Sequence, residues 1–80
     1  MKTSWTKGLE PDVVDELRGD FLSSHLIRKR LTEMLEEKID ASVKGSRNKD
    51  NYESPAWAYL QADARGYERA LSEIISLISS

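Results

Sequence analysis

An apolar stripe runs through residues 57–78 at alternating steps of three and four residues, and it constrains the fold more than any other feature. Such steps keep side chains on one face of an α-helix, and a sustained heptad repeat is typical of helices that pack on another helix. The sequence must therefore supply at least one partner helix. The stripe consists of Trp57, Leu60, Ala64, Tyr67, Leu71, Ile74 and Ile78.

A second amphipathic segment, residues 21–44, predicts that partner helix. Residues 45–53 are polar and turn-rich, which predicts an interhelical loop. Ser54 followed by Pro55 is typical of a helix start, because serine caps the first turn and proline fits just inside it. We therefore expect an antiparallel hairpin of helices at about 21–44 and 55–79. The stripe of its first helix is Ile27, Leu31, Met34, Leu35 and Ile39.

The N-terminal part predicts a short helix at about 11–18, with Pro11 in its first turn. Gly19 stands where a helix commonly ends, although one long helix running through Gly19 is the alternative. Residues 1–10 predict an irregular arm. Trp5 in this arm either folds back onto a helix or stands exposed as an anchor, and the tendency of tryptophan to be buried favours the first.

Length and composition indicate one all-α domain spanning residues 1–80. The chain has no cysteine, which excludes disulfides and thiolate zinc sites. Its 12 basic and 14 acidic residues are balanced along the chain, so composition does not favour nucleic-acid binding. We find no apolar run of the length that a signal peptide or a membrane span needs, and we expect no membrane association.

Residues with catalytic potential do not form a recognisable active site. His25 is the single histidine, and we expect it to be an ordinary half-exposed residue of a helix. The carboxylates at 33, 36, 37 and 40 are best interpreted as a solvated helix face, because the Glu-x-x-His pattern of di-metal bundles is absent. There is no phosphate-binding loop or nucleophile elbow. We therefore expect no enzymatic activity, cofactor or metal.

Candidate partner-binding residues are aromatic and basic, types that are enriched at interface hot spots. Tyr59 is the best candidate because it projects away from the stripe, whereas core packing explains Trp57 equally well. The basic candidates are consecutive along a helix, so they fan out by about 100° per residue and do not form one patch. The candidates are Tyr52, Trp57, Tyr59, Arg28, Lys29 and Arg30.

The segment 50–71 contains Ser-Pro-x-Trp-Ala, then Gln-Ala-Asp, then Gly-Tyr-x-Arg-Ala-Leu. In this phrase the chain resembles small helical proteins encoded by tailed bacteriophages, and residues 20–31 are consistent with the same group. The resemblance implies a viral origin, but it supplies neither an activity nor site residues. It also implies one of two roles, a structural or adaptor component of the virion or a protein that binds a host protein.

Together these features predict a non-enzymatic protein–protein interaction module, a small phage protein that binds and modulates a host protein, with inhibition as the favoured effect. The alternatives are a virion component or self-assembling helical bundle, and a nucleic-acid-binding hairpin dimer. The expected location is the cytoplasm of an infected bacterial host, or the virion. Because a hairpin with one short extra helix leaves apolar surface uncovered, a homodimer or another protein partner is expected to complete the core.

Overall fold

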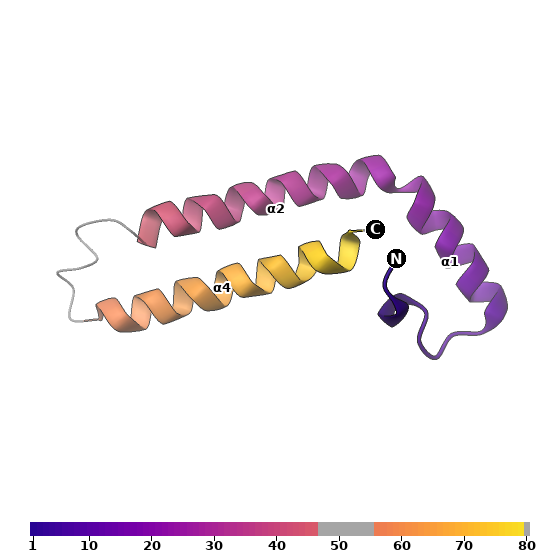
Figure 1. The fold of residues 1–80 in the computed structure, drawn as a ribbon, viewed down its shortest axis with the longest axis horizontal. Coiled ribbons are helices and arrows are strands. Elements are labelled where there is room, and N and C mark those ends of the chain that lie inside the picture. The colour runs from indigo at the N-terminus through magenta and orange to yellow at the C-terminus, as the bar shows by residue number, and fades with distance from the viewer. Residues whose placement is uncertain (47–55, 80) are drawn as a thin grey trace.

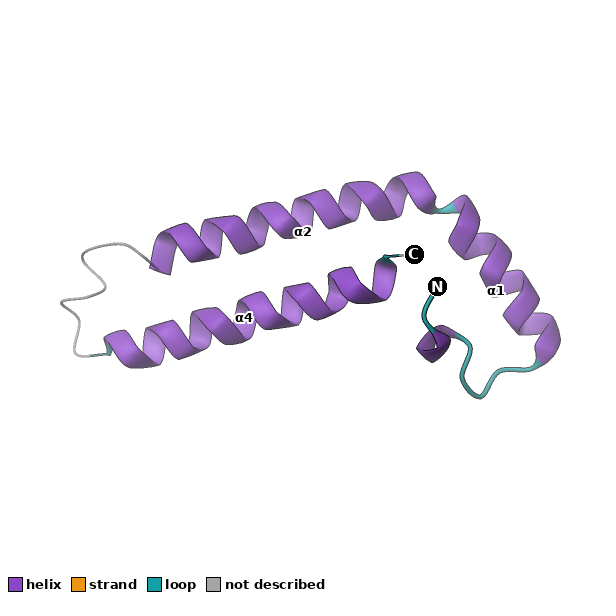
Figure 2. Cartoon of the chain, viewed as in Figure 1, coloured by secondary structure: helices purple, strands orange, loops and turns teal. Residues whose placement is uncertain are grey.

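The computed structural model describes residues 1–46 and 56–79. These contain a short 3-10 helix, η1 (Thr3–Trp5), and three α-helices, α1 (Pro11–Ser23), α2 (His25–Ser46) and α4 (Trp57–Ile78). No strand occurs in the described ranges. Helices α2 and α4 lie side by side and antiparallel, α1 turns away from the start of α2, and the N-terminal arm returns toward the end of α4 (Figure 1, Figure 2). The predicted all-α helical hairpin is confirmed.

Two hydrogen bonds near opposite ends of the hairpin fix its register. The Arg28 guanidinium donates from Nη1 to the Ile78 carbonyl over 2.7 Å, and Ser42 Oγ donates to Glu68 Oε2 over 2.8 Å. Leu35 lies midway between Arg28 and Ser42 along α2, and its side chain is only 8% exposed. The middle of the hairpin is therefore its best-packed part.

Residues 11–44 form two helices, and the break lies at Ser24 rather than at Gly19. Helix α1 continues through Gly19 to Ser23, five residues beyond the predicted end at 18. The hydroxyls of Ser23 and Ser24 donate to the carbonyls of Asp20 and Phe21, 3.0 and 2.7 Å away. Hydroxyls that bond the backbone of the preceding turn compete with helix continuation, so two consecutive serines end α1.

The start of α1 agrees with the prediction. Pro11 occupies the first turn and Glu10 is the extended residue before it. Gly8 adopts a φ of 79°, a left-handed conformation that residues with a side chain rarely take. The arm can therefore reverse direction ahead of α1.

Some predicted boundaries fall where the structure gives no description. The cap at Ser54 and Pro55 lies outside the described residues, as does most of the expected loop 45–53. Helix α2 extends to Ser46, which shortens that loop at its first residues. Helix α4 begins at Trp57, preceded by Ala56.

The apolar stripe predicted for α4 differs from the face that meets α2. Trp57, Ala64, Leu71 and Ile78 are half-buried as predicted, whereas Leu60, Tyr67 and Ile74 are 41%, 47% and 41% exposed. Positions one residue later are half-buried instead, namely Gln61, Glu68 and Ile75. On α2, likewise, Leu35 is buried and Ile39 is half-buried, while Ile27, Leu31 and Met34 are exposed.

A small aromatic cluster joins the arm, α1 and the end of α4. Phe21 is 6% exposed and meets the Trp5 ring edge-on, with ring centroids 5.8 Å apart. Trp5 folds back toward α1 and α4 but stays 36% exposed, and its Nε1 donates to the Leu77 carbonyl over 2.7 Å. Lys2 Nζ adds a hydrogen bond to Ser76 Oγ. The arm therefore closes the open end of the hairpin.

Candidate protein-binding face

The hairpin has two very different broad faces, because each long helix carries a second apolar stripe beside the packed one. Leu31 and Met34 each come one position before an inner residue, Thr32 or Leu35. On α4, Leu60, Tyr67 and Ile74 likewise come one position before Gln61, Glu68 and Ile75. One step back turns a right-handed helix by about 100°. Since α2 and α4 run in opposite directions, the same step brings both stripes to the same side of the hairpin.

We call this side the apolar face. Its residues are all exposed, and they extend along the described length of both helices. Across the described parts of α2 and α4, the charged residues at positions of this face are Lys38 and Asp63, one of each sign. The apolar face comprises Ile27, Leu31, Met34 and Ala41 of α2 and Tyr59, Leu60, Tyr67, Ala70, Ile74 and Leu77 of α4.

The opposite side is polar and is called here the charged face. Two ion pairs flank it along α2, at 3.1 Å between Arg30 and Glu33 and at 2.8 Å between Lys44 and Asp40. A solvated surface of this kind needs no cover, which leaves the apolar face as the side that does. The charged face comprises His25, Lys29, Glu33, Glu36 and Asp40 of α2 and Arg65, Arg69 and Ser72 of α4.

A polar cluster of Ser42, Arg65 and Glu68 lies between the two faces, and it joins α2 to α4 through the bond from Ser42 to Glu68. Glu68 Oε2 accepts hydrogen bonds from Arg65 Nη2 at 2.7 Å and from Ser42 Oγ at 2.8 Å. The hydrogen bond from Arg65 lowers the pKa of the Glu68 carboxyl, partial removal from water opposes this, and the Ser42 bond adds to the lowering. The same hydrogen bond raises the pKa of Arg65. This cluster explains why a glutamate takes an inner position that the apolar pattern gave to its neighbour Tyr67.

Arg28 lies inside the fold rather than on a partner-binding surface. Its Nη2 donates to the Phe21 carbonyl at 2.8 Å and its Nε to Ser24 Oγ at 2.9 Å, in addition to the bond to Ile78. The guanidinium carbon stands 3.6 Å from the centroid of the Phe21 ring. The structure thus uses this candidate to hold the ends of α1 and α4 together.

The three basic candidates do not form one patch, because Arg28 and Lys29 line the same surface hollow and Arg30 does not. Lys29 is exposed on the charged face, and Arg30 pairs with Glu33 in its own helix. This is the arrangement expected when consecutive helical positions fan out.

The aromatic candidates also separate. Tyr59 is 75% exposed and lies at an edge of the apolar face, while Trp57 is half-buried on the inner side of the hairpin. Tyr52 lies outside the described residues. Of the predicted candidates, Tyr59 is the one that the structure places on the apolar face.

Most residues of the apolar face were assigned to the core by sequence reasoning. The signal that separates the two stripes is adjacency, since Met34–Leu35, Ile74–Ile75 and Leu77–Ile78 are neighbouring apolar pairs. Neighbouring helical positions point about 100° apart. Such pairs therefore predict a helix with two apolar faces rather than one wide seam.

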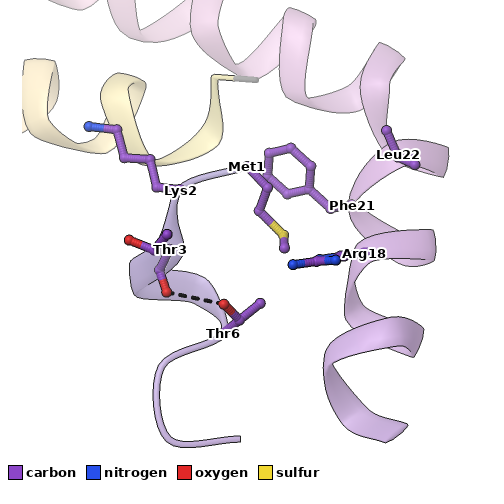
Figure 3. A pocket seen from close by; sticks show the side chains of 7 residues that line it. All are labelled: Met1, Lys2, Thr3, Thr6, Arg18, Phe21 and Leu22. Carbon is purple, nitrogen blue, oxygen red and sulfur yellow. Dashed lines mark hydrogen bonds between the residues drawn. The ribbon is translucent and has the colours of Figure 1, made fainter. Parts of the chain in front are cut away.

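A hollow of about 320 Å³ lies between the N-terminal arm and α1 (Figure 3). Phe21 forms its apolar wall, and Thr6 Oγ1 donates to the Thr3 carbonyl over 3.2 Å at its rim. Its side chains do not include a nucleophile paired with a base, or two facing carboxyls. The lining of the hollow therefore does not present either of these two catalytic arrangements. It is lined by Met1, Lys2, Thr3, Thr6, Arg18, Phe21 and Leu22.

Two further features, a group of metal ligands and a membrane-spanning helix, do not occur in the part of the chain that the structure describes. There, histidines and carboxylates do not gather into groups of three or more that could hold a metal ion. In the same ranges, none of the helices is both long enough and apolar enough to cross a membrane.

Comparison with known proteins gave no match, whether with family models, curated proteins or solved structures.

Proposed function

We propose that this chain is a non-enzymatic protein–protein interaction module that binds its partner through the apolar face. The single observation that carries the proposal is the two-sided hairpin, with one broad side apolar and uncovered and the other charged. Contiguous exposed apolar surface of this extent is characteristic of a binding site in a small protein. The proposal requires no chemistry beyond surface complementarity.

The composition of the apolar face supports binding rather than accidental exposure. It contains two tyrosines, a methionine and several aliphatic residues, and aromatic residues and methionine are enriched at protein interfaces. Tyr59 and Tyr67 can contribute large rigid contacts whose hydroxyls still reach water at a rim. Binding would remove from water the same stripes that the hairpin itself leaves exposed.

A host protein as the partner, and inhibition as the result of binding, form a finer proposal that rests on the resemblance to phage proteins. On that proposal the chain acts in the cytoplasm of an infected bacterium or is carried in the virion. A nucleic-acid partner is less favoured, because Arg28 is engaged within the fold and Arg30 pairs with Glu33.

A differential pull-down tests the proposal. The tagged chain is compared with Tyr67→Glu on the apolar face and with Arg69→Glu on the charged face, in nuclease-treated extract of the source cells. Both variants place a glutamate at an exposed position of α4, two residues apart, and Arg69→Glu changes the net charge by two units against one for Tyr67→Glu, which makes it the more stringent control. Far-UV circular dichroism checks that both stay helical.

Support requires one stoichiometric protein that the natural chain and Arg69→Glu retain and Tyr67→Glu loses. Equal recovery with all three baits, or recovery that nuclease abolishes, contradicts the proposal.

A further inference from the structure

We infer that the partner on the apolar face is a second copy of this chain, so that two hairpins pack apolar face to apolar face as a four-helix bundle. This inference rests on the proposed function, and it names a second copy, in place of the host protein of the finer proposal, as the occupant of the apolar face. It assigns the face a specific occupant, which the following observations favour.

The first observation is the amount of uncovered surface. The chain exposes 6218 Å², about a quarter more than the roughly 4,900 Å² expected for a compact monomer of its mass. A standard protein interface takes about 800 Å² from each partner. The excess therefore suffices for one standard interface, and packing two copies would lower the surface per chain to about 5,400 Å², about a tenth above the compact value.

The second observation is thickness. The chain measures 11 Å along its shortest axis, and α1, α2 and α4 do not overlap one another when viewed down that axis (Figure 1). Packed helices lie about 8–10 Å apart, so the hairpin is one helix thick and has no second layer. Domains are built from at least two layers around a core. A second copy supplies the missing layer with a surface of the same length and width.

The third observation is the small core of a single copy. Among the described residues, the buried apolar residues are Phe21 and Leu35, which keep 6% and 8% of their surface exposed. Chains of this size commonly gain the rest of their core by oligomerisation, a disulfide or a metal. The sequence contains no cysteine, and its described part holds no group of potential metal ligands. Association with another chain, a second copy or a different protein, is a further way to complete such a core.

The charge on the apolar face permits self-association. Lys38 and Asp63 have opposite signs, so two copies meet without net repulsion. The ion pairs and most other charges lie on or beside the charged face, which stays in water when the apolar faces meet. An isologous two-fold contact needs a self-complementary surface, and a neutral apolar face meets that requirement.

Sedimentation equilibrium of the full-length chain tests this inference. We compare the natural protein with Ile74→Lys on the apolar face and with the matched control Ser72→Lys on the charged face of the same helix. The natural chain and Ser72→Lys should sediment at twice 9.1 kDa. Ile74→Lys should weaken dimerisation by about 30-fold or more, the loss expected at an interface hot spot of about 2 kcal/mol.

If Ile74→Lys loses its helicity by circular dichroism, Leu31→Lys on α2 takes its place, because this change addresses the same face from the other helix. A natural chain that stays monomeric, or a dimer that persists in the apolar-face variant, overturns the inference. A monomer whose apolar face still captures a different protein in the pull-down would overturn only the second copy as partner. A monomer with no face-dependent capture would overturn both proposals.

Discussion

The guanidinium of Arg28 stacks on the ring of Phe21, with 3.6 Å between the guanidinium carbon and the ring centroid. This guanidinium has hydrogen-bond donors only. It donates to the carbonyls of Phe21 and Ile78, which lie at the C-terminal ends of α1 and α4. Helix C-termini leave carbonyls without a partner in their own helix and carry partial negative charge. One planar cation therefore stabilises two helix ends and covers the aromatic ring between them.

Arg28→Lys should destabilise the fold by about 2 kcal/mol, because an ammonium cannot form this planar fork or stack on the ring in the same way. The free energy of unfolding from urea titrations measures the effect. Arg30→Lys is the control, since it keeps an exposed cation beside Glu33 and should change stability by less than about 0.5 kcal/mol. Equal effects of the two substitutions would show that Arg28 does not hold the helix ends.

Much of the hairpin could be predicted from the sequence, because its two apolar repeats and the polar stretch between them fix two helices and a turn. The end of α1 could not, because Gly19 is tolerated within a helix and the competing hydrogen bonds of Ser23 and Ser24 decide the break. Local propensity at these positions differs by only about 1 kcal/mol or less, so such bonds can decide the boundary.

The heptad repeat that predicts the hairpin does not distinguish the apolar face from the side of α4 that packs on α2. A heptad repeat shows that Leu60, Tyr67 and Ile74 share a side of α4, but it does not show which edge of a wide apolar surface meets α2. That choice depends on polar contacts between the helices, above all the hydrogen bond from Ser42 of α2 to Glu68 of α4. A contact between residues that are distant in sequence does not produce a periodic pattern of residue types in the sequence.

Gly19→Ala should stabilise the chain by about 0.5–1 kcal/mol, because Gly19 lies inside α1 and a Cβ there meets nothing within 4 Å. Thermal unfolding measures the gain. Gly8→Ala is the matched comparison and should destabilise the chain, because its φ of 79° disfavours any residue with a side chain. A loss of stability in Gly19→Ala would contradict the observed course of α1.

Stability should depend on pH through Glu68. The fold lowers the pKa of this carboxyl, so its stabilising effect is complete above the unfolded-state pKa of about 4.3 and is lost as the pH falls through the lower folded-state value. The difference in urea midpoint between the natural chain and Glu68→Gln should therefore be largest at neutral pH and shrink in acid. Glu73→Gln, at an exposed position of the same helix, is the control. A Glu68→Gln difference that does not change with pH would contradict this linkage.

Two leucine truncations distinguish the interior of the hairpin from its apolar face. Leu35 is 8% exposed between α2 and α4, so Leu35→Ala should cost about 2–5 kcal/mol at any protein concentration. Leu60 is 41% exposed in the single chain, so Leu60→Ala should cost about 1 kcal/mol or less under dilute conditions where the chain is monomeric.

The concentration dependence of the melting temperature completes this comparison. A dimer is stabilised by mass action, so its melting temperature rises with protein concentration. If the apolar face is the contact, Leu60→Ala should flatten that rise, whereas Leu35→Ala should lower the whole curve and keep its slope. Should Leu60→Ala instead match Leu35→Ala in dilute solution, Leu60 would belong to the core, and the assignment of its stripe to the exposed face would be wrong.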